Sequence, residues 1–264
     1  MTGARATLVE VEQCGAVGVI RLNDPATLNA VSVTMIEEMM TAVERLAGAS
    51  RALVVSSRGR GFSSGANLAD VAAIEDLWQL DAGAFLESHG NPLMRQLSSL
   101  DIPWISAVRG AAAGIGCSLA LSADLIVAGE SAYFLQAFVK VGLVPDGGAT
   151  WLLAKAAGRV RAMEMMLLGE RLPAVQALEW GIVNRVVSDD AVEETALDLA
   201  QTLAAGPTIA LALTRKLAWS AATGGWEVAL AAERAAQTTA GRTRDVREGV
   251  AAFIQKRPAN FTGS

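Results

Sequence analysis

The sequence predicts an α/β fold followed by a helical C-terminal region. Short apolar runs alternate with segments of helical spacing through the first half of the chain, which is the pattern of parallel strands joined by helical crossovers. After about Trp151, nearly every segment has helical spacing instead. Hydrophobic residues make up 52% of the 264 residues and charged residues 19%. This balance favours a large buried core and is the opposite of that of a disordered chain.

The first half is expected to hold five strands and three helices. Residues 7–11 and 17–22 resemble strands around a turn near Cys14, and the sequence Asn23-Asp24-Pro25 marks a further turn. Residues 32–46 have apolar side chains at helical spacing, with Ser32 or Thr34 as the N-cap. Further strands are expected at 52–56, 104–108 and 124–128, and further helices at 91–100 and 114–123.

The second half is predicted to be almost entirely helical. We expect residues 1–200 to form the α/β core and residues 201–264 to form a helical oligomerisation region. The C-terminal helices are rich in alanine and strongly apolar, so they must pack on the core or on another subunit. Helices are expected at 156–168, 173–180, 191–204, 208–220, 226–239 and 243–256, with one strand at 184–187.

Charge and cysteine content argue against several classes of function. The net charge of −5 disfavours nucleic acid as a partner. Cys14, Cys117 and the single His89 form neither a disulfide framework nor a cluster with metal-ligand spacing, so we expect no metal site. We find no signal-peptide pattern and no apolar run long enough to cross a bilayer. These features predict a cytoplasmic protein that does not bind a membrane.

Two glycine-rich loops, each after an expected strand, expose backbone N–H groups. The first is GRGFSSGANL at 59–68, and the second is RGAAAGIGCSL at 109–119, which opens a helix. Small residues let a backbone approach a ligand, and a helix N-terminus carries partial positive charge. The second loop does not complete the G-x-G-x-x-G fingerprint of dinucleotide sites. One N–H from each loop would hold the oxygen of a thioester enolate; alternatively, the loops are ordinary connections and close packing contacts.

Three separated motifs resemble the crotonase (enoyl-CoA hydratase/isomerase) superfamily. They are GFSSGANL at 61–68, RGAAAGIGCSLALSADLIVA at 109–128 and EGVAAFIQKRPANFTG at 248–263. The resemblance extends from about Val9 to Phe261, which is essentially the whole chain. It implies a ββα spiral core with a helical C-terminal region, a homotrimer or dimer of trimers, and an acyl-CoA thioester as substrate. Coenzyme A would arrive as part of that substrate, and no separate cofactor is implied.

The same resemblance implies roles for individual residues. The N–H groups of Ala66 and Ile115 would form the oxyanion hole. Phe253 and Lys256 would lie near the nucleotide of coenzyme A, in this subunit or a neighbouring one. The remaining positions expected to bind substrate or coenzyme A are Leu28, Ser64, Gly65, Asn67, Leu68, Gly114 and Phe138.

The catalytic carboxylates distinguish this chain from the hydratases of that family. Those enzymes use two glutamates, because water is activated while a proton is delivered to carbon. The matching positions here hold Ser118 and Phe138, but Asp146 stands where several branches of the family place their catalytic carboxylate. The segments at 89–97, 137–153 and 240–253 resemble the 1,2-epoxyphenylacetyl-CoA isomerases of phenylacetate catabolism. In that branch, Asp146 would be the general acid/base.

One carboxylate is enough to move a double bond, because it takes the α-proton and returns it at the γ-carbon while the oxyanion hole holds the dienolate. The same groups could expand an epoxide ring. We expect Phe138, Val141 and Leu143 to form an apolar pocket that raises the pKa of Asp146. His89 is expected at a helix start, with a capping or surface role.

Four other interpretations stay open from the sequence. Asp146 precedes a helical segment and could simply be its N-cap. The chain could be an enoyl-CoA hydratase-like enzyme, or a hydrolase or dehalogenase in which Asp146 attacks as a nucleophile. It could also be a non-catalytic acyl-CoA-binding protein.

Overall fold

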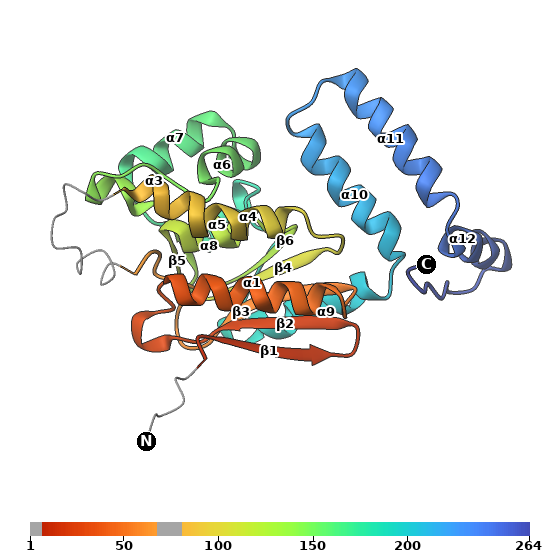
Figure 1. Cartoon of the computed structure of the whole chain (residues 1–264), viewed down its shortest axis with the longest axis horizontal. Helices are drawn as coiled ribbons and strands as arrows, with labels where there is room; N and C mark the ends of the chain where they lie inside the picture. Colours follow the sequence, from red (N-terminus) through yellow and green to blue (C-terminus); the bar gives the residue numbers. More distant parts are fainter. Residues whose placement is uncertain (1–6, 68–80) are drawn as a thin grey trace.

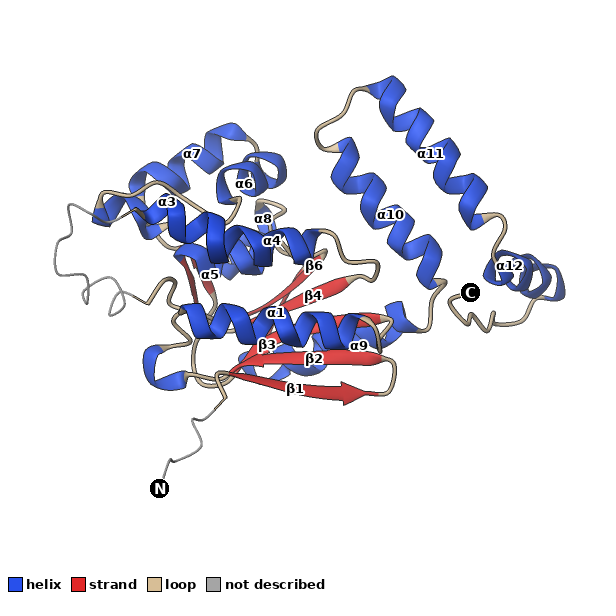
Figure 2. Ribbon diagram, viewed as in Figure 1, coloured by secondary structure: helices blue, strands red, loops and turns tan. Residues whose placement is uncertain are grey.

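The computed structural model describes residues 7–67 and 81–264, which form two β-sheets and their covering helices (Figures 1 and 2). The larger sheet has the strand order β1-β2-β3-β4-β6-β9. β1 is antiparallel to β2, and every other neighbouring pair is parallel. The strands are β1 (Val9–Cys14), β2 (Val17–Leu22), β3 (Ala52–Ser57), β4 (Trp104–Val108), β6 (Leu125–Gly129) and β9 (Arg185–Val187).

The central strands are buried on both faces, as continuous apolar runs in parallel sheets usually are. In β2, Val17 and Val19 pack in one core cluster, whereas Ile20 and Leu22 belong to the other. Helix α9 (Val192–Ala204) covers the first face, and α1 (Val33–Ala47) covers the second. Ser32 caps α1, because its side chain accepts a hydrogen bond from the Met35 N–H.

A second, three-stranded sheet lies beside the first and was not predicted from the sequence. It contains β5 (Ala111–Ala113), β7 (Tyr133–Leu135) and β8 (Leu172–Pro173). Alanine has little intrinsic preference for strands, so β5 owes its conformation to distant partners. Ala112 pairs with Phe134 of β7 and forms an isolated bridge with Ser63 of the first glycine-rich loop.

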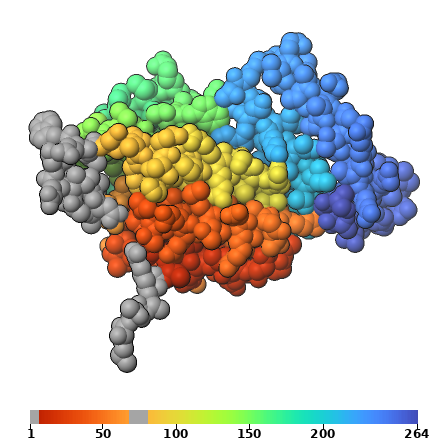
Figure 3. Space-filling view, in the orientation of Figure 1, coloured from red at the N-terminus to blue at the C-terminus, as the bar shows by residue number. Residues whose placement is uncertain are grey.

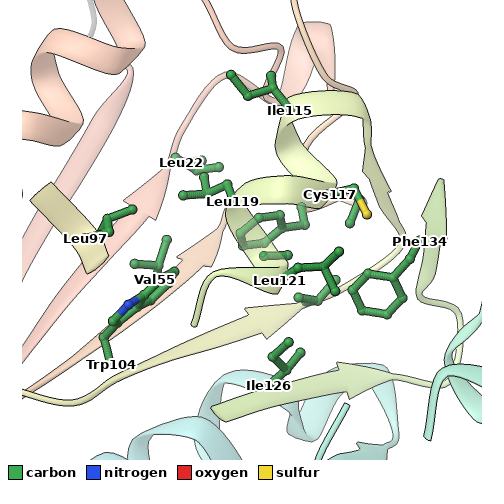
Figure 4. Packing of buried hydrophobic residues seen from close by; sticks show 14 of the residues in the cluster. Leu22, Val55, Leu97, Trp104, Ile115, Cys117, Leu119, Leu121, Ile126 and Phe134 are labelled. Atoms are coloured by element: carbon green, nitrogen blue, oxygen red, sulfur yellow. The ribbon is translucent and has the colours of Figure 1, made fainter. Parts of the chain in front are cut away.

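The remaining helices connect the strands of the two sheets. Helix α5 follows β5 directly, and its apolar residues enter the core beside Leu22, Val55 and Trp104 (Figure 4). The single helix predicted at 156–168 is wrong, because Gly158 separates two helices, ending α6 and capping α7. The helices that connect the strands are α3 (Ala82–Phe85), α4 (Asn91–Ser98), α5 (Gly114–Leu121), α6 (Ala149–Ala157), α7 (Arg159–Leu168) and α8 (Ala174–Glu179). The short helical turns are η1 (Pro25–Thr27), η3 (Leu86–Gly90), η4 (Ala137–Val141) and η5 (Asp189–Ala191).

The C-terminal helices α10 (Thr208–Ala221), α11 (Trp226–Ala240) and α12 (Arg244–Gln255) form a lobe to one side of the core (Figure 3). Residue 200 lies inside α9, whose packing on the sheet continues to Ala204. Arg215 joins the lobe to the core: it forms a 2.7 Å ion pair with Asp124 and donates to three carbonyls at the end of α4.

In the described ranges, no single helix has the length and hydropathy of a membrane span. Residues 189–204 and 208–221 have that length and hydropathy only when taken together, and a 110° bend separates them.

Candidate active site

The two glycine-rich loops meet at the N-terminus of α5. The Ser63 N–H donates to the Ala111 carbonyl at 2.8 Å, and the Ala113 N–H donates to the Ser63 carbonyl at 2.9 Å. Gly65 and Gly114 both have positive φ, and a Cβ on Gly65 would lie 3.0 Å from the Ala113 carbonyl oxygen and 3.6 Å from the Gly114 Cα. The backbones therefore touch without an intervening side chain, which only glycine allows at this separation.

Ala66 and Ile115 each follow one of these touching glycines. The Val31 N–H donates to the Gly65 carbonyl at 2.7 Å and the Asn67 N–H donates to the Val31 carbonyl at 3.0 Å. Consequently the N–H of Ala66, between them, points away from Val31, and it has no acceptor among the described residues. Ile115 is the second residue of α5, where an N–H has no intrahelical acceptor. The structure brings together the two donors expected from the sequence.

The segment around Leu28 is tied to the first loop. The Ser64 N–H donates to the Leu28 carbonyl at 2.9 Å, and the Ser64 hydroxyl donates to the Thr27 carbonyl at 2.9 Å. Asn29 is fully buried and its amide donates to the Gly61 carbonyl at 2.8 Å. No role was predicted for Asn29 from the sequence; the residue adopts positive φ, a conformation that asparagine tolerates better than most other residues do.

Of the positions expected to bind coenzyme A, those on the two loops and the Leu28 segment therefore lie together. Leu68 lies outside the described residues. Phe253 is on α12 and Lys256 is the C-cap of that helix, at the far end of the molecule from β5 (Figure 1), and Phe253 is 85% exposed. A single chain does not bring these two residues to the oxyanion loops.

Asp146 lies between η4 and α6 with a largely desolvated carboxyl group. Burial raises its pKa from the ordinary 3.8 to about 6. Its buried Oδ1 has no hydrogen-bond partner in the described part of the chain. The side chain is not the N-cap of α6, because Gly148 occupies that position and the helix has no side-chain cap. The carboxylate is thus free for a ligand.

The Asp146 segment packs directly on the first turns of α5. A Cβ on Gly147 would lie 2.8 Å from the Ser118 Cβ and 3.5 Å from the Ile115 Cγ1. The Ser118 hydroxyl donates to the Asp146 carbonyl at 2.8 Å. The acidic side chain and the second N–H donor are therefore neighbours, although they lie far apart in the sequence.

The apolar pocket expected around Asp146 is only partly correct. Phe138 is buried, and its ring lies 3.7 Å from the position of a Cβ on Gly114. Val141 and Leu143, in contrast, are 58% and 44% exposed in the single chain. They lie in η4 and just after it, where the chain turns outward at Gly142. Phe138 therefore lies against the site, while the other two side chains do not enclose it.

The π-helical turn η3 forms another wall near Ile115. A Cβ on Gly90 would lie 3.5 Å from the Ile115 Cδ1. His89 is part of this turn, not at a helix start as expected; its ring stacks on Phe85 at 5.6 Å, and its Nδ1 is 2.7 Å from the Ser88 hydroxyl. Single π-turns are often found at functional sites.

Cys117, on the helix that begins at the second loop, is poorly placed for chemistry. Cys117 is fully buried and its burial raises the thiol pKa to about 12, so it is protonated at neutral pH. No cluster of three or more His, Cys, Asp or Glu side chains suited to a metal ion occurs in the ranges that the structure covers. Asp146 with two backbone N–H groups is the arrangement that can move a proton next to a stabilised oxyanion.

Known proteins are similar to this chain in sequence and in architecture. The family model for enoyl-CoA hydratase/isomerase matches residues 12–264. The chain belongs to the enoyl-CoA hydratase/isomerase family. Two curated members are similar: a 1,2-epoxyphenylacetyl-CoA isomerase of Escherichia coli, 44% identical over 92% of this chain and 94% of the relative, and a probable enoyl-CoA hydratase of Rhodobacter capsulatus, 38% identical over 97% and 98%.

A solved structure of the family supports the fold assignment. The enoyl-CoA hydratase subunit I of Geobacillus kaustophilus has a TM-score of 0.90 and 36% identity, covering 97% of this chain and 98% of that one. This confirms the predicted crotonase-like α/β core with a helical C-terminal region. Members of the family include both hydratases and isomerases, so family membership alone leaves the reaction open.

Proposed function

We propose that the protein is an acyl-CoA isomerase that moves a double bond, or expands an epoxide ring, in a thioester substrate. The observation that carries this proposal is the single desolvated carboxylate of Asp146 beside the N–H groups of Ala66 and Ile115. The positions that hold the two glutamates of the family's hydratases carry Ser118 and Phe138, and neither side chain can serve as a base near neutral pH. The similarity to an epoxyphenylacetyl-CoA isomerase points the same way.

The proton path of the proposed reaction is short. The Asp146 carboxylate removes the α-proton of a 3-enoyl thioester, and the C–H electrons pass to the thioester oxygen, forming a dienolate. The N–H groups of Ala66 and Ile115 stabilise that oxygen. Asp146, now protonated, returns the proton to the γ-carbon, and the electrons reform the carbonyl and a 2,3 double bond. A pKa near 6 suits both steps, because the group is ionised at neutral pH and easily protonated.

In this proposal the coenzyme A portion lies along the Leu28 segment and the first loop, past Ser64, Gly65 and Asn67. Gly114 and Phe138 border the thioester. Phe253 and Lys256 would meet the nucleotide only from a neighbouring subunit, because α12 lies far from the loops of its own chain (Figure 1). The proposed assembly is a homotrimer or a dimer of trimers.

The test is isomerisation of a 3-enoyl-CoA in deuterium oxide. Wild type should form 2-enoyl-CoA, with deuterium at the γ-carbon only to the extent that protonated Asp146 exchanges with solvent before it returns the proton. Asp146→Asn should lose roughly 10²- to 10⁴-fold in kcat, the usual contribution of a general acid/base. Asp190→Asn is the matched control, since it neutralises an exposed aspartate of the described surface. An Asp146→Asn enzyme with wild-type kcat would refute the assignment.

Three other outcomes would redirect the proposal. Conversion of a 2-enoyl-CoA to a 3-hydroxyacyl-CoA by wild type would favour a hydratase, as the hydratase among the relatives suggests. An acyl group trapped on Asp146 would favour a nucleophilic hydrolase or dehalogenase. Binding of acyl-CoA with no turnover would indicate a binding protein.

A further inference from the structure

The orientation of the Asp146 carboxylate depends on its backbone. No described residue donates a hydrogen bond to the carboxylate or pairs with it, and burial is the one cause of its raised pKa. A side chain with no polar partner is held only by packing and by the position of its Cα. Whatever fixes the main chain at 146 therefore also fixes the reacting oxygens.

The main chain at this position is held from two sides. Its carbonyl accepts from the Ser118 hydroxyl at 2.8 Å and from the Ala149 N–H, in the first turn of α6, at 3.0 Å. Ser118 is fully buried and lies one helical turn after Ile115 on α5. Its hydroxyl thus joins the helix that carries one oxyanion donor to the loop that carries the acid/base.

The Ser118 hydroxyl also has a possible acceptor within its own helix, but the geometry of that hydrogen bond is poorer. The Gly114 carbonyl, four residues earlier in α5, is 3.3 Å away, which is the usual acceptor for a serine within a helix. A hydroxyl has one proton and can donate one strong hydrogen bond, and the carbonyl oxygen of Asp146 is the nearer of the two acceptors to the Ser118 hydroxyl. The geometry therefore favours the bond between elements over the bond within the helix.

We propose that Ser118 is a positioning residue, whose hydroxyl sets the distance between the Asp146 carboxylate and the oxyanion held at the start of α5. This inference rests on the proposed function and adds to it a residue that does not touch the substrate. Gly147 packs tightly on the Ser118 Cβ, so a longer side chain at 118 would displace the Asp146 loop. Serine is small enough to fit this contact and still supplies a donor.

The test compares Ser118→Ala with Ser106→Ala. Ser106 is a matched control, because it is also fully buried and its hydroxyl also joins two elements, donating to the Ala120 carbonyl of α5 at 2.9 Å. Both variants lose one buried hydrogen bond and should lose similar thermal stability. Only Ser118→Ala should lose kcat, by roughly 10- to 100-fold as expected for a misplaced catalytic group, with KM nearly unchanged.

Ser118→Cys is the conservative variant, since a thiol is of similar size and a weak donor. It should keep an intermediate kcat, and it replaces Ser118→Ala if that variant does not fold. The proposal is overturned if the kcat of the Ser118 variants stays within about twofold of that of Ser106→Ala.

A readout without substrate separates this proposal from the proposed function. Carbon-13 NMR of the Asp146 carboxyl in unliganded enzyme gives its pKa directly. Ser118→Ala should lower that pKa from about 6 toward its ordinary value, because a released loop admits water to the carboxylate, whereas Ser106→Ala should leave it unchanged. An unchanged pKa in Ser118→Ala would overturn the positioning role, even if wild type isomerised its substrate.

Discussion

Replacing Asp146 by asparagine should abolish the loss of fold stability that ionisation of this carboxyl causes at high pH, and it should also remove activity. A carboxyl whose pKa rises from 3.8 to about 6 on folding disfavours the native state once it is ionised. At about 1.4 kcal/mol for each pH unit, the effect is about 3 kcal/mol. Between these two pKa values the native protein binds the proton more tightly than the unfolded chain does. The stability contributed by the protonated group is therefore complete below the lower pKa and is lost as pH rises through about 6.

The Asp146→Asn variant has no carboxyl group at this position to ionise. Comparing its free energy of unfolding with that of wild type therefore isolates the effect of Asp146 ionisation. The introduced amide carries no charge at any of these pH values, and burying it adds a cost of about 1–3 kcal/mol that does not depend on pH. Urea unfolding of both proteins at about pH 4 and about pH 8 gives the difference in the free energy of unfolding at each pH. We expect Asp146→Asn to gain about 2–3 kcal/mol relative to wild type between these conditions.

The protein concentration must be the same throughout, because association of subunits also stabilises a fold. Asp190→Asn, at an exposed site, should show no such trend. If the difference between Asp146→Asn and wild type were the same at both pH values, the carboxylate would not be desolvated. The argument for a base with a raised pKa would then fail.

Gly147→Ala should lower kcat and cost roughly 1–3 kcal/mol of stability, because an alanine there would need positive φ and would strike α5. Gly142→Ala, also at positive φ but in open space, should retain kcat in the same isomerase assay. Light scattering should give three or six times the 27.4 kDa chain mass. The apolar face of α12 should contribute to that assembly, since Phe253 and Ile254 are 85% and 74% exposed in the single chain. Ile254→Asp should therefore shift the measured mass toward that of one chain. A monomeric wild type would refute the proposed assembly.

The fold was predictable wherever local pattern and tertiary contacts agree. The strands at 17–22 and 104–108 were predicted with the bounds that the structure has, because short apolar runs containing β-branched residues favour strands, and here the sheet also buries them. The strand Ala111–Ala113 could not be predicted, because its partners lie in the distant first glycine-rich loop and in β7. The π-turn at 86–90 has no known sequence signature comparable to a capping residue.

The candidate site was predictable in its parts but not in its connections. The resemblance to the crotonase superfamily indicated Ala66 and Ile115 as donors and Asp146 as the acid/base, whereas the glycines of the two loops alone indicated only that backbone N–H groups are exposed there. Sequence could not choose between an N-cap and a free carboxylate, since both place an aspartate before a helix. The hydrogen bond from Ser118 to Asp146 spans 28 positions and depends on how α5 and η4 pack, which no local pattern records.

The contact between Gly65 and Gly114 determines which substitutions the proposed oxyanion donors would tolerate. Both donors are main-chain atoms, so a change of side chain at Ala66 or Ile115 leaves an N–H in place, unless proline is introduced. A Cβ on Gly65 would instead press on the Ala113 carbonyl oxygen at 3.0 Å, and a side chain on Gly114 would be strained by the positive φ of that residue, so a change at either glycine should displace the N–H that follows it. Inactivating mutations in a random library should therefore gather at the two glycines, one position before the N–H groups that we propose contact the substrate.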